Sequence, residues 1–265
     1  KTMGNYGAII MLSCETDFVA TNADFVAFTT SILDNAMAKH LTNKEEVLAM
    51  TIDGRPVADL ITDQIAKIGE KIELAHFDVV EAPAVYCYIH PGNRMASVIG
   101  FNKEGYNEAG HELAMQVVAM RPMAVDADSI PQEVKDKELQ VAIEKTKEEQ
   151  IERAVESALR KAGINPAHVD SEEHMASNCA KGWITEEQVA QAKQIKEEEA
   201  AKATANLDMN KIQGIANGRL NKFFKENTLL DQEYINVSKQ AVKEFLAQTD
   251  KELKVTAFRR LELGA

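Results

Sequence analysis

The sequence contains residue types that could catalyse reactions or bind metal ions, but their spacing fits neither role. Its three cysteines are an odd number at wide spacing, which favours neither a disulfide framework nor a zinc site. His111 and Glu112 resemble the start of a metalloprotease helix, but Met115 stands where the second histidine belongs. Gly-rich phosphate loops and nucleophile-elbow motifs are also missing. The sequence therefore predicts no enzyme, no metal site and no cofactor.

An aromatic residue follows closely after a strand-like apolar run. Residues 8–12 are apolar and bounded by Gly7 and a polar cluster, which predicts a largely buried strand. The segment that follows is Thr16, Asp17, Phe18, Val19 and Ala20. On a turn beyond the strand, Phe18 either folds into the core with Val19, as most phenylalanines do, or projects as a wedge. The residues alone leave both interpretations open.

The charge balance disfavours nucleic acid as a direct partner. Lys and Arg total 30 against 42 Asp and Glu, for a formal net charge of −12, so the composition has no basic footprint. The longest apolar run is about six residues, whereas a membrane-spanning helix needs about 20. No signal segment opens the sequence. We therefore expect a cytoplasmic protein that binds neither nucleic acid nor a membrane directly.

The first 72 residues are expected to form a small α+β unit. Residues 6–12 supply a strand, and residues 25–37 a helix, because apolar side chains recur there at helical spacing. Residues 42–45 offer a capping box for a further helix that contains Val47.

Three strand-like segments follow. They cover residues 73–77, 85–89 and 95–101. A Pro-Gly-Asn turn at residues 91–93 separates the last two; Pro presets φ, and Gly and Asn tolerate a positive φ. The sequence predicts three antiparallel strands with a hairpin at this turn.

The order of strand followed by helix occurs twice. Residues 95–101 precede a helix over residues 108–120, just as residues 6–12 precede residues 25–37. The fold class we expect is α+β, with two similar core halves whose small antiparallel sheets are flanked by helices.

Between residues 135 and 205 charge density rises and strand patterns vanish. Long charged helical segments broken by Gly163 and Gly182 predict a protruding antiparallel helical hairpin of coiled-coil type. Its expected seam consists of Val141, Ile151, Val155, Leu159, Val189, Ala192 and Ile195. The alternation over residues 255–263 predicts a final strand. The expected domains are residues 1–72, residues 73–134 together with 206–265, and residues 135–205.

Separated segments in a fixed order resemble one known family. They are Thr16 to Ala20, Lys67-Ile68-Gly69-Glu70, Tyr88-Ile89-His90, and Gly218-Arg219-Leu220-Asn221-Lys222-Phe223-Phe224 with Phe258-Arg259-Arg260. Over nearly its whole length the sequence resembles bacterial translation elongation factor Ts, the guanine-nucleotide exchange factor for the GTPase elongation factor Tu. The resemblance implies two α+β core halves and a helical hairpin, in agreement with the patterns above.

The resemblance also implies roles for particular residues. In the family an Asp-Phe pair enters the GTPase near its magnesium and phosphate site. The implied wedge consists of Thr16, Asp17, Phe18 and Val19. Ile68 and Gly69 match a second contact with the GTPase domain, although Gly69 equally fits a helix C-cap. His90 matches a family histidine that touches another partner domain, although histidines in Pro-Gly turns are more often simply exposed.

The sequence departs from the family pattern in two places. The family usually begins with a small helical module, which has no counterpart here; because the sequence starts at Lys1 rather than Met, we expect an N-terminal piece, and part of the partner interface, to have been lost. The arm between about residues 145 and 202 is longer than usual. A homodimer, or a heterotetramer with elongation factor Tu, stays open. The rival interpretation is a coiled-coil scaffold or interaction protein without exchange activity.

Overall fold

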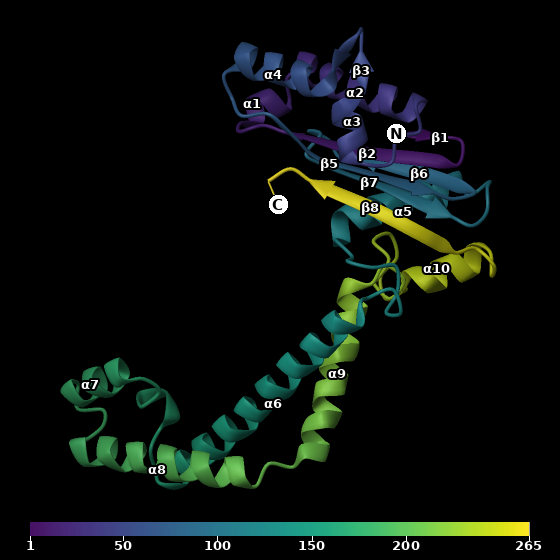
Figure 1. Cartoon of the computed structure of the whole chain (residues 1–265). Coiled ribbons are helices and arrows are strands. Elements are labelled where there is room, and N and C mark those ends of the chain that lie inside the picture. Colours follow the sequence, from purple (N-terminus) through teal and green to yellow (C-terminus); the bar gives the residue numbers. More distant parts are fainter. Residues whose placement is uncertain (265) are drawn as a thin grey trace. The chain divides into compact units, whose positions relative to one another are not determined.

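The computed structural model describes residues 1–264 and divides the chain into two compact units (Figure 1). Unit 1 combines Lys1–Ser129 with the segment that begins at Phe224, and unit 2 is Ile130–Phe223. The fold is mixed α/β with small antiparallel sheets. The expected division of the core at residue 72 into two similar halves stays a prediction.

The strands all belong to unit 1. They are β1 (Thr2–Met3), β2 (Tyr6–Ser13), β3 (Thr51–Ile52), β4 (Arg55–Pro56), β5 (Glu73–Glu81), β6 (Ala84–Ile89), β7 (Met95–Phe101) and β8 (Val255–Glu262). The helices of this unit are α1 (Asp17–Ala20), α2 (Ala23–Ala38), α3 (Lys44–Ala49), α4 (Val57–Ile68), α5 (Asn107–Met120) and α10 (Val242–Thr249). The predicted helices over residues 25–37 and 108–120, and the final strand, are confirmed.

Two three-stranded antiparallel sheets pack against each other in unit 1. One has the order β1-β2-β5 and the other β6-β7-β8. Strand β2 contacts β7 and β8 across the interface, while α2 packs on β2 and α5 packs on β6 and β7. The unit is therefore layered as helices, sheet, sheet and helices (Figure 1).

Strand β5 pairs with β2 and not with β6. Placing residues 73–77 in the sheet of the second half was therefore wrong. Alternation marks a strand but does not name its partner. Pro83, in the two-residue link before β6, has no N–H to donate to a ladder. The chain changes sheets at this link, and β6 pairs with β7 as the predicted hairpin.

Two glycines allow the sheets to approach closely. A Cβ on Gly7 would lie 2.6 Å from Val98 Cγ1, and a Cβ on Gly100 would lie 2.7 Å from Ala82 Cβ. Around them the buried side chains of Ile9, Val80, Ala82, Val85 and Val98 fill the space between the sheets. Further clusters lie beneath the helices on each outer face.

The N-cap of α3 lies one residue later than expected. Asn43 Oδ1 accepts from the N–H of Glu46 at 2.9 Å, and the Glu46 carboxylate accepts from the N–H of Thr42 at 2.9 Å. The Asn43 side chain thus caps α3, while the Glu46 carboxylate reaches Thr42, the residue before the N-cap, and not the N–H of Asn43 as a capping box requires.

Unit 2 is helical. It contains α6 (Gln132–Lys161), the 3-10 turn η1 (Pro166–His168), α7 (Glu172–Ala180), α8 (Glu186–Ala205) and most of α9 (Met209–Asn227). Helices α6 and α8 pack together, and Leu159 and Ala192 are buried in the cluster they share with the turns between them. Val141 is 53% exposed, so its place in the seam was wrong. The coiled-coil character of the hairpin stays a prediction.

Across residues 1–264, every helix is too short or too polar to span a membrane. In the same residues, His, Cys, Asp and Glu side chains do not gather in groups of three or more that could hold a metal ion.

Candidate functional site

The segment between β2 and α2, residues 14–22, is called here the β2–α2 turn. Thr16 is the N-cap of α1, with extended φ and ψ of −121° and 152°, and its Oγ1 accepts from the N–H of Val19 at 3.4 Å. Neighbouring side chains on a helix point in different directions, so Phe18 and Val19 have different surroundings. Val19 packs against the core, while Phe18 is 89% exposed. The interpretation of Phe18 as a core residue is therefore wrong.

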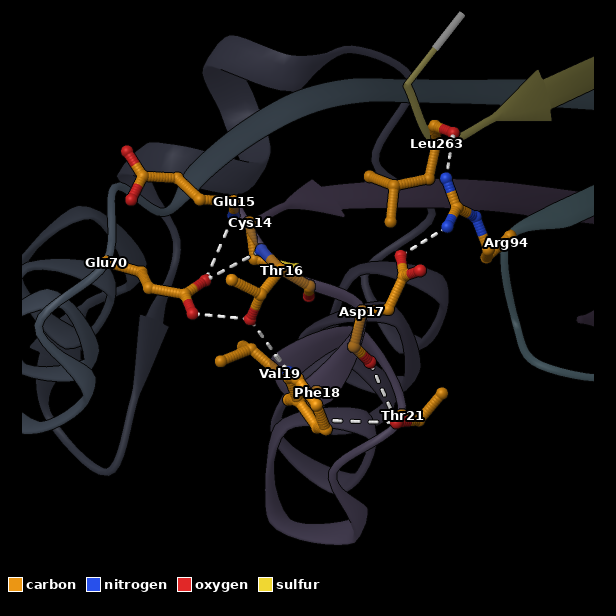
Figure 2. A network of polar contacts seen from close by, with 10 residues as sticks. All are labelled: Cys14, Glu15, Thr16, Asp17, Phe18, Val19, Thr21, Glu70, Arg94 and Leu263. Carbon is orange, nitrogen blue, oxygen red and sulfur yellow. Dashed lines mark hydrogen bonds and ion pairs between the residues drawn. The ribbon is translucent and has the colours of Figure 1, made fainter.

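The carboxylate of Glu70 holds the first residues of this turn (Figure 2). Its Oε2 accepts hydrogen bonds from the N–H groups of Glu15 and Thr16, both at 3.0 Å. Its Oε1 accepts from the Thr16 hydroxyl at 2.5 Å. These contacts satisfy backbone donors that precede α1 and would otherwise face solvent.

The position of Glu70 follows from the end of α4. Gly69 adopts a left-handed conformation with φ of 82°, and its N–H donates to the Ile65 carbonyl at 2.8 Å, so the predicted C-cap is confirmed. Ile68 is half-buried against the core, whereas Gly69 is exposed. The structure thus brings the segment of Ile68 and Gly69 to the β2–α2 turn, with Glu70 as the connection.

Asp17 is held by a residue of the loop between β6 and β7. Its carboxylate forms an ion pair with the Arg94 guanidinium, which also donates to the Leu263 carbonyl at 3.4 Å (Figure 2). The Leu263 N–H in turn donates to the Arg94 carbonyl at 2.7 Å. The Thr21 hydroxyl donates to the Asp17 carbonyl at 2.8 Å. The β2–α2 turn is therefore attached to the β6–β7 hairpin and, through Arg94, to the segment after β8.

His90 begins the loop that carries Arg94. Its N–H donates to the Met95 carbonyl at 2.9 Å, which closes the hairpin, and its ring is exposed. Its Nδ1 lies 3.1 Å from the Tyr88 hydroxyl. The Tyr88 ring also packs edge-on against His111, with centroids 5.5 Å apart. The Asp17–Arg94 ion pair therefore joins the loop of His90 to the β2–α2 turn.

The electrostatics of the site favour a charged Glu70 and a neutral Cys14. The hydrogen bond from the Thr16 hydroxyl is the main cause that lowers the pKa of Glu70 below its ordinary value. Burial, together with the nearby carboxylates of Glu70 and Asp17, raises the pKa of the Cys14 thiol. The arrangement presents an apolar ring and a carboxylate on a fixed turn.

Two residues of the site were not found by sequence reasoning in the roles they have. Glu70 was noted only as part of a motif, and Arg94 was not singled out. Their partners are far away along the chain: Glu70 reaches Thr16 across 54 residues and Arg94 reaches Asp17 across 77. Local periodicity carries no signal for such pairs, but a Gly C-cap does indicate that the residue after it leaves the helix.

Comparisons with known proteins identify the family of the chain. A model of the family "Elongation factor TS" matches residues 15–167 and 152–265. The elongation factor Ts of Phocaeicola vulgatus is 51% identical over all of this chain and 80% of its own length. Those of Bacteroides fragilis and Porphyromonas gingivalis are 50% and 35% identical, over 100% and 98% of this chain and 81% and 75% of their own lengths. The chain belongs to the elongation factor Ts family, the guanine-nucleotide exchange factors of elongation factor Tu.

Proposed function

We propose that Asp17 and Phe18 form the wedge by which this chain releases GDP from elongation factor Tu. The observation that carries the proposal is the 89% exposure of Phe18 on a turn anchored by Glu70 and Arg94. An exposed phenylalanine gains about 1.5–3 kcal/mol when it is buried. The isolated chain leaves the Phe18 ring exposed, so burial of the ring in a pocket of the partner would stabilise the complex by this amount.

The wedge would act mechanically, without covalent chemistry. Magnesium and phosphate hold a nucleotide through contacts that depend strongly on geometry, so a small displacement of switch or phosphate-loop elements forfeits much of the binding. Linkage requires that nucleotide weakens the binding of the exchange factor by the same factor by which the exchange factor weakens nucleotide binding. Asp17 adds a negative charge that phosphate would repel.

Ile68, Gly69 and His90 are the second contacts with the partner in this proposal. Gly69 and His90 are both exposed; Gly69 directly precedes Glu70, and His90 lies in the loop that carries Arg94. The chain would act in the cytoplasm, with elongation factor Tu as its partner and no direct contact with nucleic acid or membrane. The rival scaffold interpretation is not favoured, since it gives no role to the exposed Phe18.

The test is release of a fluorescent GDP analogue from elongation factor Tu. The parent chain should accelerate release strongly, and Phe18→Ala should reduce the acceleration by roughly 10- to 100-fold, the factor that corresponds to burial of one phenylalanine. Met123→Ala is the matched control, because Met123 is a 54% exposed hydrophobic residue outside the site. Equal activity of parent and Phe18→Ala would refute the wedge.

A second measurement addresses assembly. Light scattering of the chain, alone and with elongation factor Tu, separates a one-to-one complex from the homodimer and heterotetramer considered above. Deletion of the arm in the same experiment tests the scaffold, which requires self-association to depend on the helical hairpin.

A further inference from the structure

Glu70 makes more contacts with the β2–α2 turn than its place at the end of α4 requires. The three hydrogen bonds to its carboxylate come from the N–H of Glu15, the N–H of Thr16 and the hydroxyl of Thr16. Gly69 has already closed α4 through its own N–H. The carboxylate is therefore not a helix cap for α4, and its hydrogen bonds hold the β2–α2 turn.

The start of the turn depends on this anchor, because normal internal hydrogen bonds hold mainly its later part, such as those from the Thr21 N–H to the Asp17 carbonyl and from the Asn22 N–H to the Val19 carbonyl, both at 3.0 Å. The N-cap contact from the Val19 N–H to Thr16 Oγ1 is 3.4 Å long, and α1 is a single turn that cannot sustain itself as an isolated helix. Thr16 Oγ1 both receives that contact and donates to Glu70 at 2.5 Å. Glu70 thus fixes the residue from which α1 starts, and with it the direction of Phe18.

Fixing the turn in advance matters for a wedge. A segment that is mobile in the free protein pays an entropic cost when a partner orders it, whereas a segment already held in the bound geometry avoids that cost. Ion pairing of Asp17 with Arg94 restrains the turn at the next residue, but leaves Glu15 and Thr16 to Glu70.

We propose that Glu70 is a positioning residue for nucleotide exchange, which holds the β2–α2 turn so that Phe18 enters the partner already oriented. The inference rests on the proposed function of Phe18. It assigns to Glu70 no contact with the partner. Loss of the carboxylate leaves the contacts that other residues make with elongation factor Tu intact. It therefore lowers the rate of GDP release at saturating concentrations of the chain more than it raises the half-saturating concentration.

Three substitutions at Glu70 separate hydrogen bonding from charge and from reach. Glu70→Ala removes every contact. Glu70→Gln keeps the shape: its carbonyl oxygen can accept both N–H groups, and its amide can donate to Thr16 Oγ1 in place of receiving from it. Glu70→Asp keeps the charge but is one methylene shorter. Glu104→Ala is the control, an exposed glutamate in the loop after β7.

Two readouts are needed. The first is the rate of fluorescent GDP release from elongation factor Tu against concentration of the chain. The second is hydrogen exchange of the Glu15 and Thr16 amides, measured by NMR on the free chain. Glu70→Ala should lower the saturating rate by at least about tenfold, since it removes three hydrogen bonds to a charged group and one alone corresponds to about that factor, and should speed exchange of both amides. Glu70→Gln should stay within about threefold of the parent, and Glu70→Asp should resemble Glu70→Ala.

Several results would overturn the inference. One is a Glu70→Ala chain whose saturating rate lies within twofold of the parent; another is unchanged amide exchange in that variant. Equal impairment of Glu70→Gln and Glu70→Ala would show that charge at this position acts directly, against a positioning role. A parent chain that fails to release GDP would instead refute the proposed function, while the amide measurement would still report whether Glu70 holds the turn.

Discussion

Arg94, in the loop between β6 and β7, forms an ion pair with Asp17 at the start of α1. Both side chains are largely exposed, at 45% and 74%, so the pair adds little to global stability. Its effect is local: together with the contacts between Arg94 and Leu263, it connects the β2–α2 turn, the β6–β7 loop and the segment after β8.

Arg94→Ala should therefore reduce exchange without unfolding the protein. We expect the free energy of unfolding to change by less than about 1 kcal/mol, because exposed ion pairs contribute no more than that. Exchange should fall several-fold, since the Asp17 carboxylate loses its restraint. Arg55→Ala is the control, as Arg55 also forms an exposed ion pair, with Asp63. A large fall in melting temperature for Arg94→Ala alone would contradict this assignment.

The sequence predicted the helices and strands of unit 1 better than it predicted which strands pair with each other. The Pro-Gly-Asn hairpin followed from turn chemistry, and Gly92 and Asn93 do adopt positive φ values of 89° and 57°. By contrast, β5 was assigned to the wrong sheet, because alternation marks a buried face and says nothing about which strand lies beside it.

The candidate site likewise contains residues that the sequence could indicate and contacts that it could not. Phe18 could be proposed from a motif, but its exposure could not be decided, since a phenylalanine after a strand is usually buried. The anchors Glu70 and Arg94 are polar residues in loops, and their contacts form only once distant segments are packed. In unit 2, helical spacing placed Leu159 correctly in the core and Val141 wrongly, because an apolar residue on a long helix is buried only where a partner covers it.

Gly110→Ala tests the packing of α5 on the sheet. A Cβ at Gly110 would overlap the Tyr86 ring, which itself packs edge-on against Phe101. Since the ring cannot leave without disturbing that contact, we expect a loss of about 1–3 kcal/mol in the free energy of unfolding, measured by chemical denaturation.

Gly214→Ala is the control for this change. Gly214 lies within α9 with open space around it, so alanine there should stabilise by about 0.5–1 kcal/mol through helix propensity. Equal effects of the two substitutions would mean that the contact with Tyr86 does not limit packing.

The ionised carboxylate of Asp250 should make the stability of the protein depend on pH in the acidic range. Its carboxylate accepts from Lys103 Nζ at 2.8 Å, the Tyr106 hydroxyl at 2.5 Å and the Glu252 N–H at 2.8 Å. These contacts, that of Lys103 first, hold the pKa of Asp250 well below its usual range. Because the folded pKa is lower than the unfolded one, the stabilisation is present above about pH 4 and is lost as the pH falls further.

The measurement is thermal unfolding of the parent and Asp250→Asn between pH 2 and pH 7. The parent should be more stable by a constant amount above about pH 5, and the difference should shrink below about pH 4. Asp128→Asn, at an exposed position, is the control and should show no such convergence. A difference that stays constant down to pH 2 would contradict the role of the ionised carboxylate.

Leu159→Ala should destabilise unit 2 in a way that one fluorophore can report. The sequence contains a single tryptophan, Trp183, which lies in this unit beside His168 and Lys181, with distances of 5.7 Å between ring centroids and 5.0 Å from Nζ to the ring centre. Leu159 is 1% exposed in the cluster shared by α6, α8 and the turns between them, so truncation leaves a cavity that costs about 2–5 kcal/mol. The midpoint of the tryptophan fluorescence transition in urea should fall accordingly.

Val141→Ala is the control, at a 53% exposed position on the same helix. It should change the free energy of unfolding by less than about 0.5 kcal/mol. Equal shifts for the two variants would mean that the buried cluster does not hold the unit together.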